Sequence, residues 1–388
     1  MTAATPLETN AVPKLTADEL AGLGSRHNLA DAHTHQSPTA AEVEGIVDRL
    51  PEIFWESVRG SQSFIDEQAA TAFLKLNGQD SAVPLDWYLP VYSSSVAMEI
   101  IANAMRLRGR TAAMLTEPTF DNIADILRRQ DVNLVPVRLA STRTYREAIN
   151  TALKREHADT LVLVLPNNPT GHYLTKHDLA EVAEACAQRS MSLILDTSFR
   201  LHDPRMTFDH YEVLKSSGVD FVVIEDTGKI WPTTDLKLAY LLASDSWRPL
   251  LEQIQQDVLL NVSKFISCLV WHFCELSEQD QLESVRSVLQ INRRTLRSAI
   301  SQGLLPFEVV HPESAVSVEF VRIIDGRSAT EVVNHLRAHG IAVLSGEAFY
   351  WSHPAEGSIY IRIALARDPS SFTAAIEALL DAFRLEAR

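Results

Sequence analysis

The sequence predicts an α/β fold, with a large domain built on a mainly parallel sheet covered by helices and a smaller α+β domain after it. Unbroken apolar runs with the character of buried strands alternate with amphipathic helical segments. Strands of this kind are typical of parallel sheets that helices cover on both faces. After about residue 265 this alternation gives way to long helical patterns and short strands. We therefore expect an N-terminal segment at 1–40, a large domain at 41–265 and a small C-terminal domain at 266–388.

The first hundred residues are expected to be helical after an irregular start. Residues 1–40 are polar, and the capping-box-like string TADE at 16–19 predicts the start of a short helix. The block at 41–76 has a helical pattern. The string YSSSVAMEIIANAM at 92–105 places three serines before an amphipathic helix.

The remaining elements follow from apolar runs and turn signals. Four strands are expected in TAAMLTEP (111–118), LVLVLPNNPTG (161–171), MSLILDTSF (191–199) and DFVVIEDTGK (220–229). Helices are expected at 122–130 and at 174–190, the latter capped by Thr175. In the small domain, helical patterns over 262–300 precede strands in SAVSVEF, IAVLS and YIRIAL and a final helix at 370–386.

Composition restricts the class of protein and its partners. The chain has 388 residues, of which 46% are hydrophobic and 22% charged, as in globular proteins. Its net charge of −15 repels nucleic acids and anionic membranes and attracts cationic small molecules. The three cysteines form neither a zinc spacing nor a disulfide framework, and the sequence shows neither a secretory signal nor a membrane span. We expect a cytoplasmic protein that binds no nucleic acid, membrane or metal.

Three predicted strands end in polar side chains of different chemistry. Asn168, Asp196 and Lys229 each follow an apolar run, and ligands of open parallel sheets lie outside the carboxyl ends of the strands. An amine, a carboxylate and an amide suit pyridoxal 5′-phosphate (PLP). The aldehyde of PLP forms a Schiff base with lysine, its ring nitrogen needs a carboxylate, and its ring oxygen needs a donor. The serines before the helix at 92–105 would bind its phosphate.

Each of these signals is weak when taken singly, because an Asp after a strand is usually a turn residue and serine triplets are usually helix caps. NNPTG is more specific, since two Asn, a Pro and a Gly in that order define a particular turn. The conjunction carries the argument: Asp196 lies 28 residues after Asn168, and Lys229 lies 33 residues after Asp196.

The strings NNPTG, LILDTSF, EDTGK and YIRIALAR resemble, in order, the landmarks of fold-type I PLP enzymes of the class I/II aminotransferase superfamily. The resemblance covers roughly residues 85–385 and implies the fold-type I PLP-transferase fold. It identifies Lys229 as the Schiff-base lysine, Asp196 as the partner of the ring nitrogen and Asn168 as the donor to the ring oxygen. It also implies that Phe120 stacks on the ring and that Arg362 binds the substrate α-carboxylate in a bidentate fork. The other cofactor-binding residues that it implies are Ser93, Ser94, Ser95, Ser198 and Lys237.

Two positions depart from the pattern of the superfamily. Phe199 replaces the typical tyrosine, so the ring oxygen loses one donor. Asp226 replaces the typical serine three residues before the lysine. Because a carboxylate beside a phosphate is repelled, we expect Asp226 to face the substrate instead.

A narrower resemblance explains both departures. The strings NLADAHTHQ, YSSSVAMEI, EPTFDNIAD, LDTSFR and VVIEDTGKIWPTTDLK are similar to the PLP-dependent L-arginine oxidases and hydroxylases of the enduracididine and related pathways of antibiotic biosynthesis. The resemblance implies that residues 1–40 cover the active site and contribute Thr16, Glu19, Asp31 and His33. Glu19, Asp31 and Asp226 would then surround the substrate guanidinium, which stays charged and needs carboxylate partners.

The activity implied by this resemblance is the oxidation and hydroxylation of L-arginine with O2. The products would be 4-hydroxy-2-ketoarginine and 2-ketoarginine, together with ammonia and hydrogen peroxide. His33 is the candidate acid/base, because imidazole titrates near neutral pH. The resemblance also implies a homodimer.

Three other interpretations stay open at this stage. A conventional aminotransferase acting on a basic amino acid would use the same cofactor residues, and so would a PLP-fold protein that binds its ligand without turnover. The string DAHTH at 31–35 could instead open the metal site of an amidohydrolase barrel, whose ligands alternate along a strand. The residues before DAHTH do not read as a strand, however, and we interpret His35 as incidental.

Overall fold

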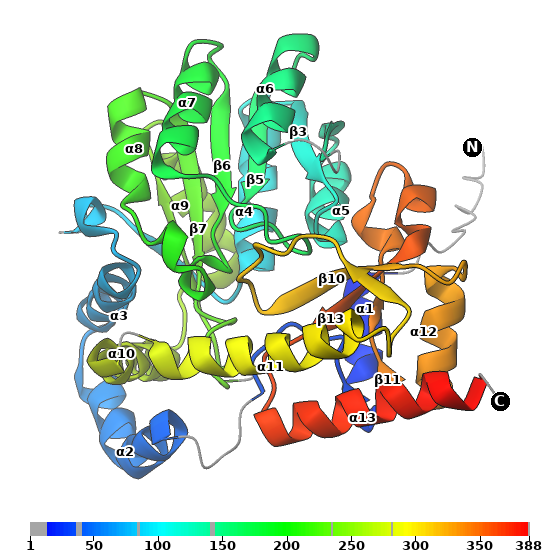
Figure 1. Ribbon diagram of the computed structural model, residues 1–388. Helices are drawn as coiled ribbons and strands as arrows, with labels where there is room; N and C mark the ends of the chain where they lie inside the picture. Colours follow the sequence, from blue (N-terminus) through cyan, green and yellow to red (C-terminus); the bar gives the residue numbers. More distant parts are fainter. Residues whose placement is uncertain are drawn as a thin grey trace, which may run out of the picture.

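The structure is a computed structural model that describes residues 14–35, 41–83, 86–139, 144–233, 236–280 and 282–386. Its largest element is a seven-stranded sheet that forms the middle of the large domain (Figure 1). The strand pairs from β4 to β7 are all parallel, whereas β8 is antiparallel to both neighbours. This confirms the predicted α/β class with a mainly parallel sheet. In spatial order the strands are β2 (Leu89–Val91), β8 (Ala239–Ala243), β7 (Asp220–Asp226), β6 (Ser192–Asp196), β5 (Thr160–Val164), β3 (Ala112–Glu117) and β4 (Asn133–Arg138).

Helices cover both faces of this sheet, which is why its central strands are apolar on both sides. Every residue of β5 and β6 is buried. In β5, Leu161 and Leu163 belong to one core and Val162 and Val164 to the other, because successive side chains of a strand point to opposite faces. The first core contains α3 (Gln62–Leu76), α6 (Tyr145–Arg155), α7 (Lys176–Ala187) and α8 (His210–Ser217), and the second contains α4 (Ser94–Leu107), α5 (Asp121–Arg129) and α9 (Arg248–Leu259).

The helical block predicted at 41–76 forms two helices, α2 (Ala41–Arg59) and α3, which is capped by Ser61. The long helix α10 (Lys264–Asp280) packs against both of them and shares the first core through Cys268, Phe273 and other apolar residues. We therefore propose that the large domain extends through α10 and that the division between the domains falls before α11 (Glu283–Ser301) rather than at residue 266.

The small domain is an antiparallel sheet packed against helices, as the sequence predicts. The sheet has the order β12 (Leu344–Ser345), β13 (Tyr360–Ala364), β10 (Val318–Ile323) and β9 (Phe307–Val309). It shares a separate core with α11, α12 (Ala329–Ala338) and α13 (Pro369–Glu386). Short 3-10 helices complete the fold: Asp80–Ala82, Arg200–His202, Pro204–Met206, Glu347–Phe349 and Pro354–Ile359.

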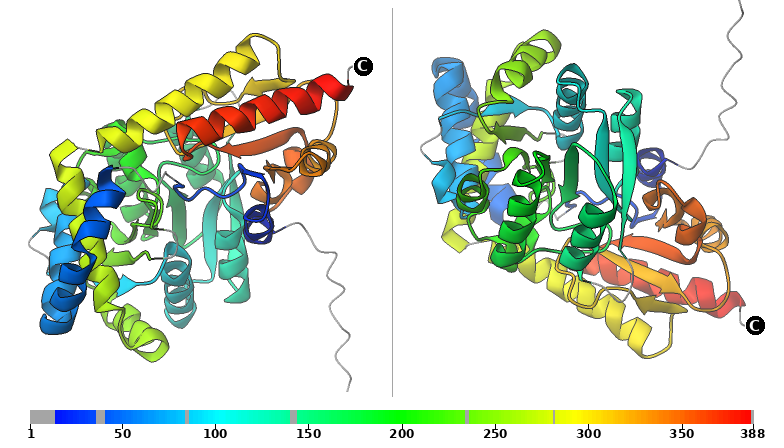
Figure 2. Two further views of the ribbon diagram at one scale, coloured as in Figure 1. Left: turned by 90° about the horizontal axis from the view of Figure 1, so that it is seen from below. Right: turned by 90° about the horizontal axis from the view of Figure 1, so that it is seen from above.

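The N-terminal segment lies against the small domain, and the views from below and above both place its helix beside the C-terminal elements (Figure 2). The short strand β1 (His27–Asn28) pairs in parallel with β11 (Ile341–Ala342). The predicted helix is present as α1 (Leu15–Gly22), but the predicted capping box at 16–19 is wrong, since the N-cap is Lys14. Thr16 and Glu19 are instead interior helix residues whose side chains line a pocket. Residues 1–13 and 36–40 of the predicted segment lie outside the described residues.

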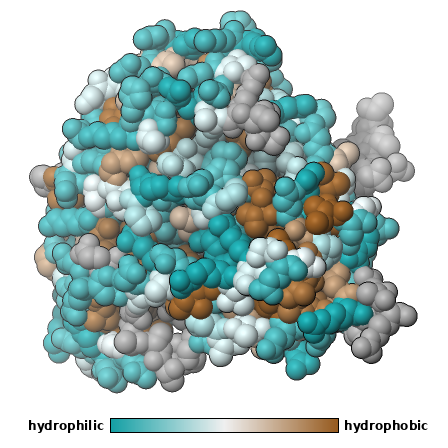
Figure 3. All heavy atoms as spheres, in the orientation of Figure 1, coloured by the Kyte–Doolittle hydropathy of each residue, from teal (hydrophilic) through white to brown (hydrophobic). Residues whose placement is uncertain are grey.

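The outer surface, the cysteines and the apolar helices can be compared with what the composition predicts. The face in Figure 3 is mostly hydrophilic, with apolar side chains in separate patches. All three cysteines are free and buried. Within the described ranges no single helix is long and apolar enough to cross a membrane, and only the pair α9 and α10 passes this test jointly, although it is bent by 118°.

A buried ion pair lies between β7 and the 3-10 helix that follows β6. The guanidinium of Arg200 contacts Glu225, and both side chains are almost completely buried. Tyr211 donates a hydrogen bond of 2.8 Å to Glu225, and Asn77 accepts one of 3.2 Å from Arg200. Of the two adjacent carboxylates at the end of β7, Glu225 therefore has a structural role, since its partners Arg200 and Tyr211 are buried in the core.

We expect Arg200→Met to lower the free energy of unfolding by about 3–5 kcal/mol, since it leaves Glu225 buried without its cation. The double variant Arg200→Met/Glu225→Gln should recover part of this loss, and guanidinium chloride denaturation measures both. A loss below about 1 kcal/mol in the single variant would show that the pair is unimportant.

Candidate active site

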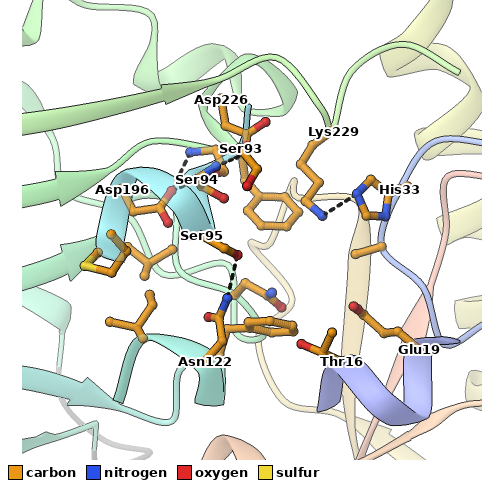
Figure 4. Close-up of a pocket in the computed structure, with 18 of the residues that line it drawn as sticks. Thr16, Glu19, His33, Ser93, Ser94, Ser95, Asn122, Asp196, Asp226 and Lys229 are labelled. Carbon is orange, nitrogen blue, oxygen red and sulfur yellow. Dashed lines mark hydrogen bonds between the residues drawn. The ribbon is translucent and has the colours of Figure 1, made fainter. Parts of the chain in front are cut away.

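The carboxyl ends of β5, β6 and β7 open into a pocket of about 220 Å³ (Figure 4). The start of α4, the start of α5 and the N-terminal segment close its other sides. Most of the predicted site residues meet here, although they come from distant parts of the chain. The lining residues are Thr16, Glu19, Ala32, His33, Ser93, Ser94, Ser95, Met98, Phe120, Asn122, Ile123, Val164, Asn168, Asp196, Ser198, Phe199, Asp226, Lys229 and Lys237.

Asp196 is a buried carboxyl group at the end of β6, and the part of the chain that the structure describes gives it no ion pair. Its Oδ1 accepts hydrogen bonds from the backbone N–H (3.0 Å) and the hydroxyl of Ser198. Burial nevertheless raises the pKa of Asp196 to about 6. Its Oδ2 receives no hydrogen bond from the residues that the structure describes. A positively charged group in the pocket would stabilise the ionised form, as expected for the partner of a protonated ring nitrogen.

Lys229 lies three residues after the end of β7 and points into the same pocket from the other side in this view (Figure 4). Burial lowers the pKa of Lys229, although nearby carboxylates, Glu19 and Asp226 first among them, oppose this shift. A lowered pKa increases the fraction of neutral amine, which is the nucleophilic form. The backbone carbonyl of Lys229 accepts a hydrogen bond of 2.7 Å from Thr34, so the N-terminal segment is attached directly to the lysine loop.

The start of α4 binds an anionic group, as predicted, but that group is Asp226. Ser93 is the N-cap of the helix, and the backbone N–H of Ser94 donates a hydrogen bond of 3.0 Å to Oδ2 of Asp226. The N–H of Gly228 donates to Oδ1 at 2.5 Å. Unpaired N–H groups at a helix start attract a carboxylate. Asp226 also lines the pocket, and its predicted role toward the substrate stays a prediction.

A second protein carboxylate lies on the arginine that was assigned to the substrate. Arg362 is fully buried and donates a hydrogen bond of 2.7 Å from Nη2 to Glu19, as well as one to the carbonyl of Ala30. Its Nη1 donates to Oδ1 of Asn168 at 3.3 Å. The amide oxygen of Asn168 is therefore used as an acceptor, and its N–H groups can serve as donors, which is compatible with the predicted donor role. Arg362 and Asp31 are the two predicted site residues that do not line the pocket.

Both carboxylate oxygens of Asp31 contact histidines in this structure, and its predicted role at the substrate guanidinium stays a prediction. Its Oδ1 contacts Nδ1 of His33 at 2.5 Å, and its Oδ2 contacts Nε2 of His35 at 2.6 Å. Burial opposes the charge of Asp31, yet the hydrogen bonds from the two histidines hold the pKa of the carboxyl far below its usual range. His35, predicted to be incidental, contacts the same carboxylate as His33 but does not line this pocket. Residues 31–34 form no strand, so the strand geometry required by the metal-site interpretation of DAHTH is absent.

His33 lies between this carboxylate and the two lysines of the pocket. Its Nε2 contacts Nζ of Lys229 at 3.3 Å and Nζ of Lys237 at 3.0 Å. Burial and the charge of Lys229 lower the pKa of His33 despite the nearby Asp31. The Nε2 atom of His33 is therefore placed to accept a hydrogen bond from either lysine. Lys237 lines the pocket and contacts His33, and its role at the phosphate, implied by resemblance, stays a prediction.

One polar lining residue escaped the sequence analysis. Asn122 donates a hydrogen bond of 2.9 Å to the hydroxyl of Ser95, which fixes the serine loop against α5. It lies two residues after Phe120, within the string PTFDN. The apolar residues Met98, Ile123 and Val164 also line the pocket, and their sequence signal is only that of core residues.

The residues present fit PLP on structural grounds. The start of α4 would bind the phosphate of PLP, and Arg362 would bind the carboxylate of the substrate. Both positions bind a protein carboxylate in this structure, which shows that each can hold an anion. A buried carboxyl group, Asp196, and a buried amine, Lys229, point into the same pocket. Asp196 would hold the ring nitrogen, and Lys229 would hold the aldehyde carbon.

We expect borohydride reduction of the PLP-loaded protein to attach the cofactor to Lys229 and to no other residue. Lys229→Ala should lose the label, whereas Lys237→Ala, which removes the other pocket lysine, should retain it, and mass spectrometry of peptides distinguishes the two. A label on Lys237, or one that persists in Lys229→Ala, would contradict the assignment.

Comparisons with known proteins agree with this geometry. Residues 57–379 match the family model "Aminotransferase class I and II". A solved structure of MppP soaked with its product 2-ketoarginine is 35% identical, with a TM-score of 0.82, and the match covers 90% of this chain and 98% of that one. The α-aminoadipate aminotransferase LysN from Thermus thermophilus is 16% identical, with a TM-score of 0.78 and coverage of 96% and 95%, which shows the fold alone.

Among curated proteins the similarity is weaker. L-serine phosphate decarboxylase of Campylobacter jejuni is 24% identical over 251 residues, which span 63% of this chain and 62% of that protein. Aspartate aminotransferase of Thermococcus kodakarensis is 22% identical over 192 residues, or 50% of each chain. The chain thus matches about half to three fifths of the length of these relatives. The family match extends over most of the chain, and together with the fit of the pocket it supports the predicted cofactor, PLP. The chain belongs to the class I and II aminotransferase family.

Proposed function

We propose that the protein oxidises L-arginine with O2 and PLP as cofactor, giving 4-hydroxy-2-ketoarginine and 2-ketoarginine with ammonia and hydrogen peroxide. The observation that carries the proposal is the ion pair between Glu19 and Arg362 beside Lys229. It puts one cationic and one anionic group in reach of a substrate that carries both charges. The 35% identity to MppP, a structure of which was soaked with the product 2-ketoarginine, supports the same substrate.

Substrate binding would exchange the partners of this ion pair. The α-carboxylate of L-arginine takes the place of Glu19 on Arg362, where a planar guanidinium can bind it through two hydrogen bonds. Glu19 is then free to bind the guanidinium of the substrate, helped by Thr16 one turn earlier on α1. A neutral amino acid would leave Glu19 without a partner, so the exchange favours a basic side chain.

The chain supplies the proton-transfer groups next to the substrate. PLP, when bound, withdraws electrons from the substrate Cα, and Asp196 favours the protonated ring that makes this possible. The amine of Lys229 takes the Cα proton. His33, in contact with that amine, accepts or returns a proton in the later steps. Residues of α1 and of the segment 28–35 form one wall of this region.

Purified protein with PLP and L-arginine, without any keto acid, should consume O2 in an oxygen electrode and release peroxide and ammonia. Mass spectrometry should detect the two keto acids, and Lys229→Ala serves as the inactive control. Conversion that depends on a keto-acid acceptor, without O2 uptake, would favour a conventional aminotransferase. Binding of L-arginine without any conversion would favour a non-catalytic PLP-fold protein.

Glu19→Gln should reduce the preference for L-arginine over L-citrulline, expressed as the ratio of kcat/KM values, by roughly 10- to 100-fold, because the lost contact joins two charged groups. Both substrates have the same α-carboxylate, so effects on Arg362 cancel in the ratio. Asp18→Asn on the same helix, where Asp18 faces Arg337 at 3.7 Å, is the matched control. An equal change for both substrates would contradict the role of Glu19.

The homodimer and the cytoplasmic location stay predictions. The side chains of Phe54, Trp55 and Val58 on α2 are each about half exposed. Contiguous apolar residues of this kind are typical of interaction surfaces, which supports pairing with a second copy of the chain.

A further inference from the structure

A chain of four polar side chains leads from the reactive lysine to a second cavity. Lys229 contacts Nε2 of His33, Nδ1 of His33 contacts Asp31, and the other oxygen of Asp31 contacts Nε2 of His35. The distances are 3.3, 2.5 and 2.6 Å. His35 is about one third exposed and lines a cavity of about 430 Å³ on the side away from the active site, together with His27.

Hydrogen-bonding capacity determines the form of His33 in this chain. An ionised carboxylate can only accept hydrogen bonds, so His33 must donate to it through Nδ1–H. Its Nε2 is then an acceptor, and it faces the amines of Lys229 and Lys237. The carboxylate thus selects the tautomer whose free nitrogen points at the reactive amine.

The backbone around this chain is fixed by Arg367. Its guanidinium donates hydrogen bonds to the carbonyls of Asn28 (2.7 Å), Asp31 (2.6 Å) and His33 (2.9 Å). Residue 35 also forms a β-bridge with Arg367. The backbone of Asp31 is therefore held in place, but its carboxylate can still rotate about its side-chain bonds unless both oxygens are bound.

We propose that His35 is a positioning residue that acts through Asp31 to keep His33 oriented and in the tautomer that accepts from Lys229. His35 binds the second oxygen of Asp31 and so holds the carboxylate in line with the ring of His33. The inference rests on the proposed function in one respect, since it takes His33 to transfer protons there. It adds a residue that no resemblance assigned to the site.

The charged groups around these rings determine the direction of the effect. His33 faces Asp31 on one side and Lys229 and Lys237 on the other. Asp31 is faced by His33 and His35 and lies near Arg367. Removing the hydrogen bond from His35 leaves the charge of Asp31 to act on His33 alone. The pKa of His33 should then rise. As the pH is lowered, His33 should become protonated, and so lose its acceptor nitrogen, at a higher pH than in the wild type.

Three variants test the proposal. His35→Ala removes the donor to Asp31, His35→Gln retains an N–H group near the position of Nε2, and His27→Gln alters a histidine of the same cavity for which no contact with Asp31 is present. Nitrogen-15 NMR of histidine-labelled protein, with His33 assigned by His33→Gln, reports the tautomer without any substrate. Thermal unfolding of each variant measures the structural contribution of the side chain.

We expect His35→Ala to show mixed or protonated His33 at neutral pH, to move the acid limb of kcat/KM to higher pH, and to lower kcat on the order of tenfold. His35→Gln should restore the wild-type tautomer and most of kcat, and His27→Gln should match wild type. An unchanged His33 spectrum and pH profile in His35→Ala would overturn the proposal, even with a lower Tm. If the wild-type protein does not oxidise L-arginine but the nitrogen-15 spectrum of His33 still changes in His35→Ala, the proposed function fails and the positioning role stands.

Discussion

The geometry of parallel strands is the constraint on which the site depends. Register places Asp196 at the end of β6 beside Ile224 of β7, so the loop that carries Lys229 begins next to the buried carboxyl group. Burial shifts both groups toward their neutral forms, since it raises the pKa of Asp196 and lowers that of Lys229. A pocket that holds a buried amine near a buried carboxyl group is chemically suited to a pyridine aldehyde.

The N-terminal segment joins the two domains at this pocket. It pairs with the small domain through β1 and β11, accepts hydrogen bonds from Arg367, and donates one from Thr34 to the backbone of Lys229 in the large domain. Because these contacts come from both domains, the position of His33 depends on how the domains pack. A segment with little secondary structure of its own is thereby held firmly enough to carry reactive groups.

Charge compensation explains the partners of the carboxylates around the pocket. Glu225 is paired with Arg200 in the core, Glu19 with Arg362, and Asp31 with two histidines. Asp226 uses backbone N–H groups instead. Buried charges require partners of this kind, so a bound substrate with two charged ends must rearrange existing pairs as well as form new ones.

The sequence by itself determined the sheet, its helices and the residues at the strand ends. Apolar runs, capping boxes such as that at Thr175, and the spacing of Asn168, Asp196 and Lys229 are local signals that survive folding. The resemblance to known enzymes identified the cofactor residues, and most of them meet in one pocket.

Only the tertiary structure decided the partners of the charged side chains. Local sequence gave no sign that Asp226 would bind the start of α4, that Glu19 would bind Arg362, or that His35 would share Asp31 with His33. These contacts join residues from separate elements, or depend on an irregular backbone that other elements hold in place. Hydrogen bonding is directional, so partners of this kind follow from the packed arrangement of the chain and not from the order of its residues.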